Sequence, residues 1–369
     1  MRLPRQNLRT PGPTPIPQDI VDAMGEPMIN HRGPEFLDLI TTATEKLKQV
    51  FMTQNDLFIL TSSGTGSLEA ALVNTLSPGD QVLGISAGAF GDRFCDIADA
   101  FGAKLKRVNV EWGEPIDPDL VRQEIKNNPE IQAVMITHNE TSTGVTHDLE
   151  SIAQVVKGEF GKLLLVDAVS SLGCVPLPVD GWDCDMVGTA SQKGFMIPPG
   201  LAFISVSQDA WQAQKTAKMP KFYFDLAEAK SYLEMGQTPW TPNLSAIYGL
   251  GLALDKMLAE GIENIFARHS SIAQYTREAV QDLGLQLLCS DAKRASDTVT
   301  AIKLPENVDG SKLMSLMRTE ENVVLAGGQG KLTGKIFRIG HLGWVSQEDI
   351  AEVIEALQRV LPQLGFNAR

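Results

Sequence analysis

The sequence predicts an α/β fold, with a mostly parallel sheet in a large domain and a smaller α+β domain towards the C-terminus. Short apolar runs typical of strands alternate with segments of helical apolar spacing over the first two thirds of the chain. Such alternation is typical of parallel strands with helices on both faces. Beyond about residue 255 the regular alternation is lost. The length of 369 residues also exceeds one typical core, which favours two domains.

Each element of the large domain follows from a local pattern. Residues 36–52 place Phe36, Ile40, Leu47 and Phe51 on one face at helical spacing. Further helices are expected at residues 67–76, 94–101, 119–126 and 152–160. Short apolar runs predict strands at residues 57–60, 81–85, 104–109, 133–137, 163–166, 185–189 and 202–206. In such a sheet, ligands bind outside the carboxyl ends of the strands.

The two ends of the chain differ from this pattern. Five prolines within residues 1–17 remove backbone donors and block helix formation, so we expect an extended N-terminal arm. Residues 18–255 are assigned to the large domain and residues 256–369 to the small one. In the small domain, helices are expected at 262–283, 312–319 and 347–364, and strands at 298–304 and 336–339.

Composition narrows the classes of function. The net charge of −13 argues against nucleic acid as a partner, because phosphate backbones are bound by clustered Lys and Arg. No apolar run is long enough to span a bilayer, and the first residues lack an apolar signal segment. The four cysteines form no CxxC pair, so we expect reduced thiols, no metal site and a cytoplasmic location.

Three short motifs follow predicted strands. The turn Ser63-Gly64-Thr65 opens a helix, and the free N–H groups at a helix start suit a phosphate, although a plain helix cap explains it equally well. Asp167 ends an apolar strand. A carboxylate desolvated at this place needs a cationic partner; the alternative is a structural Asp that caps the next helix. Lys193 lies in a loop of small residues, where it is either a solvated lysine or a Schiff-base amine of lowered pKa.

These motifs, in this order, resemble the class V aminotransferases, and more narrowly the alanine–glyoxylate and serine–glyoxylate (serine–pyruvate) group. The similarity runs nearly from end to end. It includes Pro11-Gly12-Pro13, Ser63-Gly64-Thr65-Gly66, Thr137-His138-Asn139-Glu140-Thr141-Ser142-Thr143-Gly144, Val166-Asp167-Ala168-Val169-Ser170-Ser171, Ser191-Gln192-Lys193 and Arg338-Ile339-Gly340-His341-Leu342-Gly343. The resemblance implies a fold-type I transferase with pyridoxal 5′-phosphate as cofactor, because that cofactor needs a phosphate cup, an acid at its ring nitrogen and an amine at its aldehyde.

The resemblance also implies cofactor roles for individual residues. Lys193 would hold the cofactor and carry protons, and Asp167 would pair with the ring nitrogen. Val169 and Phe90 would contact the two ring faces, and Phe90 departs from the Trp that is common in the family. The ring hydroxyl would bond to Thr141, and the phosphate would be held by Ser63, Gly64, Thr65 and Gln192.

Other residues are implied to act on the substrate or on the partner subunit. Arg338 would hold the substrate carboxylate with a bidentate guanidinium, and Gly12 would line the substrate pocket. Thr241 would reach the phosphate of the neighbouring subunit in a homodimer with shared sites. Thr238 is a second candidate for this contact, because the alignment with the family can shift in this segment.

The implied reaction moves an amino group from alanine or serine to glyoxylate or pyruvate. Three alternatives remain open: 2-aminoethylphosphonate–pyruvate transamination, cysteine desulfuration and a non-catalytic subunit on the same fold. Desulfuration needs a mobile cysteine nucleophile, and Cys289 is the only cysteine in the C-terminal half. A nicotinamide dehydrogenase is not favoured, because a GxGxxG turn is lacking.

Overall fold

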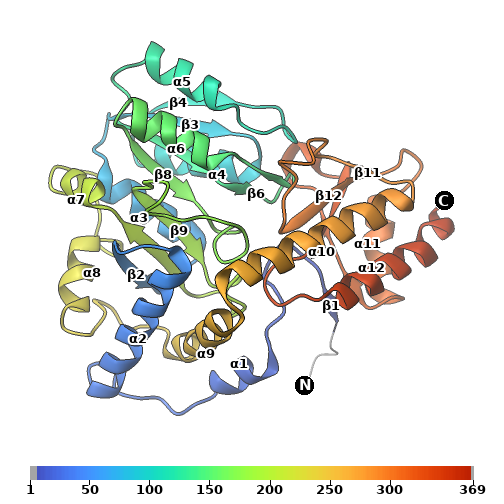
Figure 1. Ribbon diagram of the computed structural model, residues 1–369, viewed down its shortest axis with the longest axis horizontal. Helices are drawn as coiled ribbons and strands as arrows, with labels where there is room; N and C mark the ends of the chain where they lie inside the picture. Colours follow the sequence, from blue (N-terminus) through green and yellow to red (C-terminus); the bar gives the residue numbers. More distant parts are fainter. Residues whose placement is uncertain (1–5, 367–369) are drawn as a thin grey trace.

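The computed structural model describes residues 6–366, and the remainder of the predicted arm, residues 1–5, lies outside them. Figure 1 shows a large domain that carries the main sheet and a smaller domain beside it, which contains α10 (Ile262–Asp282) and the elements that follow. The boundary proposed at residue 255 falls inside α9 (Leu244–Glu260), the helix that precedes α10. The mostly parallel sheet and the smaller α+β unit are both present.

The main sheet has seven strands in the order β2-β10-β9-β8-β5-β3-β4. The central strands β3, β5, β8 and β9 pair in parallel, and β4 pairs in parallel at the edge. β10 runs antiparallel to both of its neighbours. The strands are β2 (Asp56–Leu60), β3 (Gln81–Ser86), β4 (Lys104–Asn109), β5 (Ala133–Thr137), β8 (Leu163–Asp167), β9 (Met186–Ala190) and β10 (Ala202–Val206).

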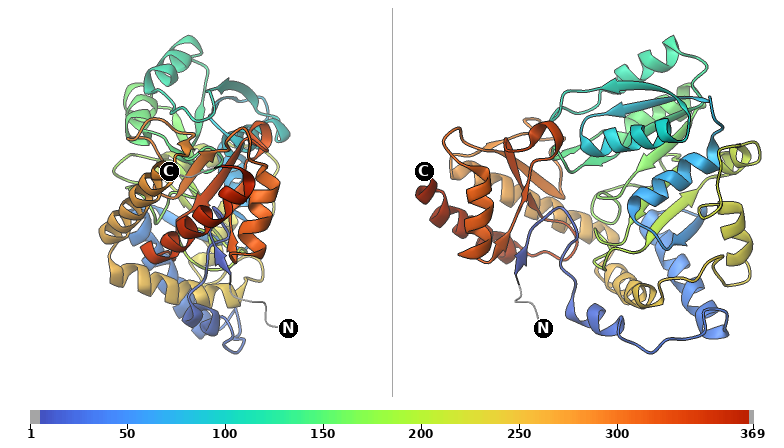
Figure 2. Two further views of the ribbon diagram at one scale, coloured as in Figure 1. Left: turned by 90° about the vertical axis from the view of Figure 1, so that its right-hand side faces the viewer. Right: turned by 180° about the vertical axis from the view of Figure 1, so that it is seen from behind.

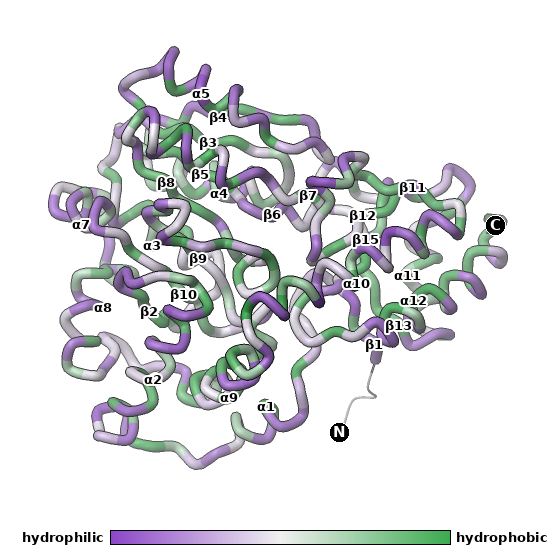
Figure 3. Tube along the Cα trace, in the orientation of Figure 1, coloured by the Kyte–Doolittle hydropathy of each residue, from purple (hydrophilic) through white to green (hydrophobic). Residues whose placement is uncertain are grey.

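Helices cover both faces of this sheet. Successive side chains of each strand point to opposite sides, so the buried strands present apolar side chains on both faces. In β5, Val134 and Ile136 belong to one core cluster, whereas Ala133 and Met135 belong to the other. The first face packs against α2 (Pro34–Phe51), α5 (Pro118–Asn127), α6 (Leu149–Ala153) with its π-helical extension (Gln154–Glu159), and α9. The second packs against α3 (Gly64–Thr75), α4 (Ala89–Ala100), α7 (Gln208–Gln214) and α8 (Leu226–Leu233). Figure 3 shows the resulting apolar centre and the banded outer helices.

The small domain has a four-stranded antiparallel sheet in the order β11-β12-β15-β14. Its core is formed with three helices. The elements are α10, β11 (Gln286–Leu287), β12 (Val299–Lys303), α11 (Gly310–Thr319), β14 (Ala326–Gly327), β15 (Ile336–Gly340), α12 (Gln347–Val360) and a 3₁₀ turn (Pro362–Leu364). The helix expected at 347–364 therefore ends earlier, at Val360.

The arm joins the two domains. Its first described segment, β1 (Asn7–Leu8), pairs in parallel with β13 (Val323–Val324) of the small domain, and the arm then leads to α1 (Gln18–Ala23) on the large one. The view from behind in Figure 2 shows this path beside the small domain. A short hairpin of β6 (Asn139–Glu140) and β7 (Val145–Thr146) follows β5.

Candidate active site

A cavity with about 860 Å³ of empty space opens at the carboxyl ends of five strands of the main sheet. Residues that follow β2, β3, β5, β8 and β9 meet there, as the α/β architecture predicts. The predicted site residues that line it are Ser63, Gly64, Thr65, Phe90, Thr141, Asp167, Val169, Gln192 and Lys193. More than twenty residues separate each of these motifs from the next along the chain, and the sheet brings them to one edge.

Lys193 and Asp167 line this cavity together. Lys193 lies in the turn after β9, and its Nζ donates a hydrogen bond to the carbonyl of Pro11 in the arm. Burial lowers the pKa of the Lys193 amine to about 8, and the nearby Asp167 carboxylate partly opposes that effect. A fraction of the amines is therefore neutral and nucleophilic near neutral pH.

Asp167 is the last residue of β8, and its side chain is 5% exposed. Its Oδ1 accepts a hydrogen bond of 2.9 Å from the backbone N–H of Val169, and Thr137 Oγ1 lies 3.5 Å from Oδ2. Burial raises the pKa of the carboxyl to about 6. Such a carboxylate is stabilised by any cation that enters the cavity.

The start of α3 forms one wall of the cavity. Ser63 is the N-cap residue, and its side chain does not cap the helix, so the first N–H groups of the helix are open to a ligand. A Cβ atom on Gly64 would lie 2.7 Å from Val169 Cγ2, which explains a glycine at this position. Gln192 Oε1 is buried without a hydrogen-bond partner among the described residues. The open N–H groups of the helix and the unpaired amide of Gln192 mark this wall as a binding surface.

Phe90 and Val169 contribute apolar surface to the cavity. Phe90 lies in the first turn of α4 (Ala89–Ala100), which starts directly after β3. The first turn of α4 is fixed by Glu140, whose buried carboxylate accepts hydrogen bonds of 3.1 and 3.0 Å from the backbone N–H groups of Phe90 and Gly91. The ring position of Phe90 is thereby tied to the hairpin that carries Thr141.

Arg338 and Gly12 do not line the cavity themselves, but each lies against a residue that does. Arg338 projects from β15 of the small domain. Its Nη1 donates a hydrogen bond of 3.0 Å to the carbonyl of Thr141, which lines the cavity. The side chain is buried, and burial lowers its pKa to about 10. Gly12 of the arm lies against Lys193: a Cβ atom there would be 2.5 Å from Nζ.

Thr241 and Thr238 lie outside the cavity. Thr241 is exposed before α9, and Thr238 donates its hydroxyl hydrogen to the carbonyl of Trp240 at 2.7 Å. Neither residue contacts the site of its own chain.

Sequence reasoning missed five residues that line the cavity: Leu68, Arg93, Asn139, Ser170 and Gln329. Arg93 follows Phe90 by three residues, so helical spacing could have found it, and its guanidinium lies 5.0 Å from the centre of the Phe90 ring. Asn139 and Ser170 lie beside predicted residues in the motifs. Gln329 belongs to the small domain, and no local pattern connects it with the cavity.

Asn139 links the cavity to the small domain. Its Nδ2 donates to Ser170 Oγ at 2.8 Å and to Thr298 Oγ1 at 2.9 Å. Its Oδ1 accepts from Thr146 Oγ1 and Ser296 Oγ, each at 2.6 Å. All four hydrogen-bonding positions of the amide are filled, so Asn139 acts as a fixed connection between the domains.

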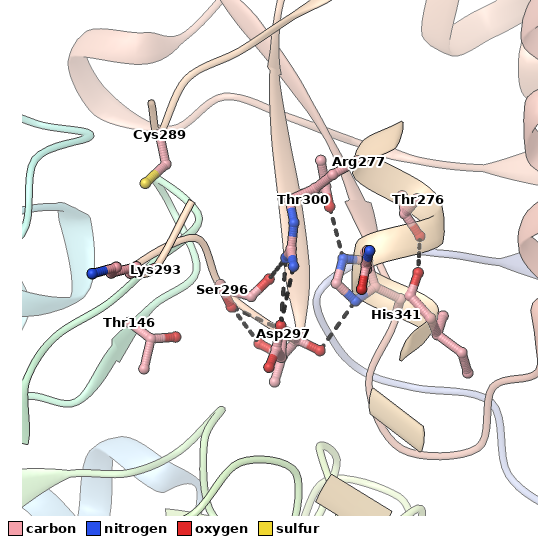
Figure 4. Close-up of polar contacts among 12 residues, drawn as sticks. Thr146, Thr276, Arg277, Cys289, Lys293, Ser296, Asp297, Thr300 and His341 are labelled. Carbon is pink, nitrogen blue, oxygen red and sulfur yellow. Dashed lines mark hydrogen bonds and ion pairs between the residues drawn. The ribbon is translucent and has the colours of Figure 1, made fainter. Parts of the chain in front are cut away.

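The connection continues through Asp297 to His341 (Figure 4). Arg277 of α10 donates to the carbonyl of Ser296 at 2.9 Å and pairs with Asp297 at 3.4 Å. His341, three residues after Arg338, bonds through Nδ1 to the carbonyl of Asp297 and through Nε2 to Thr300 Oγ1. Burial lowers the pKa of His341 to about 3, so the ring is neutral, donates from Nδ1 and accepts at Nε2. This network fixes the end of β15 relative to the cavity.

The model of the class V aminotransferase family matches residues 7–346. The chain belongs to this family. A "soluble hydrogenase, small subunit" of Synechococcus is 45% identical to this class V aminotransferase over 97% of this chain and 94% of the relative. A serine–glyoxylate aminotransferase of Methylorubrum extorquens is 37% identical over 98% and 92% of the two chains.

The crystal structure of an alanine–glyoxylate aminotransferase from Nostoc superposes on this class V aminotransferase with a TM-score of 0.94. The two chains are 31% identical, and the superposition covers 98% of this chain and 96% of that one. The resemblance inferred from the motifs and the fold-type I architecture are both confirmed.

In the described part of the chain, none of the helices is both long and apolar enough to cross a membrane. Among residues 6–366, no three or more His, Cys, Asp or Glu side chains are placed to hold a metal ion together.

Proposed function

We propose that this aminotransferase holds pyridoxal 5′-phosphate on Lys193 and moves the amino group of a small amino acid, alanine or serine, to glyoxylate or pyruvate. The observation that carries the proposal is the meeting of Lys193, Asp167 and the start of α3 in one cavity. An amine, a buried acid and a set of free N–H groups are the three contacts that this cofactor requires. The similarity to glyoxylate aminotransferases supports the choice of substrates.

The residues present fit the cofactor. The side-chain amide of Gln192 has no hydrogen-bond partner at Oε1, so it is free to turn and donate from its nitrogen, and the free N–H groups at the start of α3 suit a phosphate. Asp167 has a raised pKa because it is buried without a paired cation, and a protonated pyridine nitrogen would supply one. Phe90 and Val169 offer apolar surfaces for the two ring faces, and Thr141 a hydroxyl for the ring oxygen.

Lys193 would attach the cofactor and then move the substrate proton. When bound, the pyridine ring accepts electrons from the substrate Cα and so makes the Cα proton acidic. Burial holds the pKa of the Lys193 amine at about 8, so the released amine can accept that proton near neutral pH. Asp167 keeps the ring nitrogen protonated, and Gly12 leaves room for the lysine to move.

Arg338 would bind the carboxylate that the amino acid and the oxo acid share. Its guanidinium is buried, and no carboxylate within the described part of the chain forms an ion pair with it. A buried cation without an anionic partner is stabilised when an anion binds. The fixed network through His341 and Asp297 keeps this arginine in place.

A homodimer with shared sites is part of the proposal. Thr241 is exposed close to an aromatic cluster of Phe222, Tyr223 and Trp240, in which Phe222 is 76% exposed. Exposed aromatic clusters of this kind are typical of interfaces. We assign this surface to a second copy of the chain, whose cofactor phosphate Thr241 would contact.

Two other parts of the proposal follow from composition. The excess of acidic residues disfavours nucleic acid as a partner, since the net charge is −13. We assign the enzyme to the cytoplasm, since its four cysteines are free and buried.

The alternative of cysteine desulfuration finds no support at Cys289. The thiol is buried and donates to the carbonyl of Asp291 at 3.5 Å, and burial raises its pKa. A nucleophilic cysteine needs an exposed thiol of lowered pKa.

A panel of amino donors and acceptors tests the proposed function. Purified enzyme loaded with cofactor is mixed with alanine, serine, glycine, aspartate or 2-aminoethylphosphonate and with glyoxylate or pyruvate. Aspartate is included because Arg93 adds a second cation to the cavity. We expect alanine or serine with glyoxylate or pyruvate to react best. Preference for aminoethylphosphonate, or no transfer from any donor, would contradict the proposal.

A further inference from the structure

Gln329 reaches into the same cavity as Lys193 from the loop between β14 and β15. Arg338 Nη1 donates a hydrogen bond of 3.3 Å to Gln329 Oε1. Because a guanidinium has donors and no acceptor, the amide atom that faces it must be the oxygen. The amide nitrogen Nε2, with its two hydrogens, is therefore turned away from Arg338.

The Nε2 group of Gln329 has no partner within residues 6–366. The side chain is half-buried and lines the cavity. Two amide hydrogens are thus available to a molecule that enters the cavity next to Arg338, and that molecule must offer an acceptor.

The guanidinium of Arg338 is largely occupied by the protein itself. Its Nε donates to the carbonyl of Gly327 at 3.0 Å, and Nη1 donates to the carbonyl of Thr141 and to Gln329 Oε1. Among the nitrogens of this guanidinium, only Nη2 donates to no acceptor within residues 6–366, so both of its hydrogens are free. A bidentate grip on a carboxylate needs two donor nitrogens, and Nη2 supplies one of them.

The loop that carries Gln329 is fixed before any ligand binds. Gln329 precedes the 3₁₀ turn Gly330–Leu332, and its carbonyl accepts from the N–H of Leu332 at 3.0 Å. Lys331 Nζ lies 4.7 Å from the centre of the Trp112 ring, which belongs to the large domain. The loop is therefore held against the large domain, and a donor held in this way costs little ordering entropy on binding.

We propose that Gln329 and Arg338 form a joint clamp for the substrate α-carboxylate. Arg338 Nη2 binds one carboxylate oxygen, and Gln329 Nε2 donates to the other. A carboxylate accepts hydrogen bonds at both oxygens and donates none, so it matches these two donors. Gln329 also orients the guanidinium through its Oε1, and it is thus both a binding and a positioning residue.

The clamp rests on the proposed transamination and has a consequence for both halves of the reaction. The amino donor and the oxo-acid acceptor carry the same α-carboxylate. A clamp for that group affects the binding of both substrates, whereas contact with a substrate side chain would affect one of them. The two half-reactions therefore distinguish these roles.

The first test measures each half-reaction of the holoenzyme by cofactor absorbance, with alanine and then with pyruvate. Gln329→Leu removes the donor, and Gln329→Glu replaces it by a charge that pairs with Arg338 and repels the substrate. The control is Gln363→Leu, an exposed glutamine of the same domain. We expect Gln329→Leu to raise both KM values about tenfold with kcat changed less than about threefold. Gln329→Glu should raise both KM values further.

The second test uses propionate, which has a carboxylate but neither an amino nor an oxo group. Its affinity for the holoenzyme, measured by calorimetric titration, should fall about tenfold in Gln329→Leu and stay unchanged in Gln363→Leu. Unchanged propionate affinity, or a KM change in one half-reaction only, would overturn the clamp. If the wild type transfers no amino group but its propionate affinity still depends on Gln329, the proposed function fails and the clamp stands.

Discussion

Gly12 of the arm lies so close to Lys193 that a Cβ atom at position 12 would fall 2.5 Å from Nζ. The φ of Gly12 is +124°, in a region that side chains rarely adopt. The arm also holds the backbone of the lysine loop, since Thr14 N–H donates to the carbonyl of Gln192 at 3.1 Å and Thr14 Oγ1 to that of Lys193 at 3.1 Å. The arm is thus in direct contact with the lysine loop of the proposed active site.

Gly12→Ala should therefore displace the lysine amine. We expect turnover to fall about 100-fold, because small errors in the position of a catalytic group are costly. The control is Gly251→Ala in α9, where a Cβ atom would meet nothing within 4 Å. Cofactor titration and steady-state rates measure the effect. Wild-type cofactor binding and turnover in Gly12→Ala would show that the contact has no role.

Attachment of the cofactor to cofactor-free enzyme should depend on pH through Lys193. The neutral amine is the nucleophile, and burial lowers its pKa to about 8. The attachment rate should therefore rise about tenfold per pH unit below 8 and level off above it. Stopped-flow absorbance measures the rate, with free lysine blocked at its α-amino group by acetylation as control; its side-chain amine should keep gaining rate up to about pH 10.4. An enzyme profile that follows free lysine contradicts the lowered pKa.

Cofactor affinity should weaken in acid through Asp167. The carboxyl has a pKa of about 6 in the cofactor-free cavity, and pairing with a cationic ring nitrogen favours its ionised form. Above pH 6 Asp167 loses no proton on binding, so its contribution to the affinity is constant; below pH 6 its proton must leave, so the affinity falls. Asp167→Asn should bind more weakly and lose this dependence. Equilibrium titration with the cofactor from about pH 4.5 to about pH 8 measures the affinity on both sides of the Asp167 pKa of about 6. Identical pH profiles for the wild type and Asp167→Asn would show that Asp167 does not pair with the ring nitrogen.

The shared site predicts complementation between two inactive variants. Lys193→Ala lacks the amine, and Thr241→Glu would place a negative charge beside the phosphate of the partner subunit. In a mixed dimer, one site combines an intact Lys193 with an intact Thr241. Co-expressed and refolded mixtures should therefore regain activity that neither variant has alone. Activity no greater than the sum of the two would contradict a site shared in this way.

Much of the fold was predictable because helical and strand periodicities differ and each is local. The strands at 104–109, 133–137 and 202–206 were placed at their observed bounds. The direction of β10 was not predictable, since an apolar run gives no orientation, and its antiparallel pairing depends on the connection of residues 191–201 between β9 and β10. The sequence pattern predicts no element within 207–255, although α7 and α8 form there and α9 begins there.

The cavity residues were predictable where a motif lies at a strand end, as for Asp167 and Lys193. Residues that enter from the small domain were not, unless a motif pointed to them. Arg338 was found through its motif, whereas Gln329 becomes a neighbour of Lys193 only after β15 and its loop fold against Trp112. Asn139 lies within a quoted motif, but its four hydrogen bonds join two domains that no local pattern relates.

Reduction of the cofactor-loaded enzyme with borohydride, followed by peptide mapping, is the most direct test of the covalent link. Borohydride makes the bond between a lysine amine and the cofactor aldehyde permanent, so the modified residue can be read by mass spectrometry. We expect the modification on Lys193, and its absence from Lys193→Ala. Modification of another lysine in the wild type, or none, would contradict the assignment of this cavity as the active site.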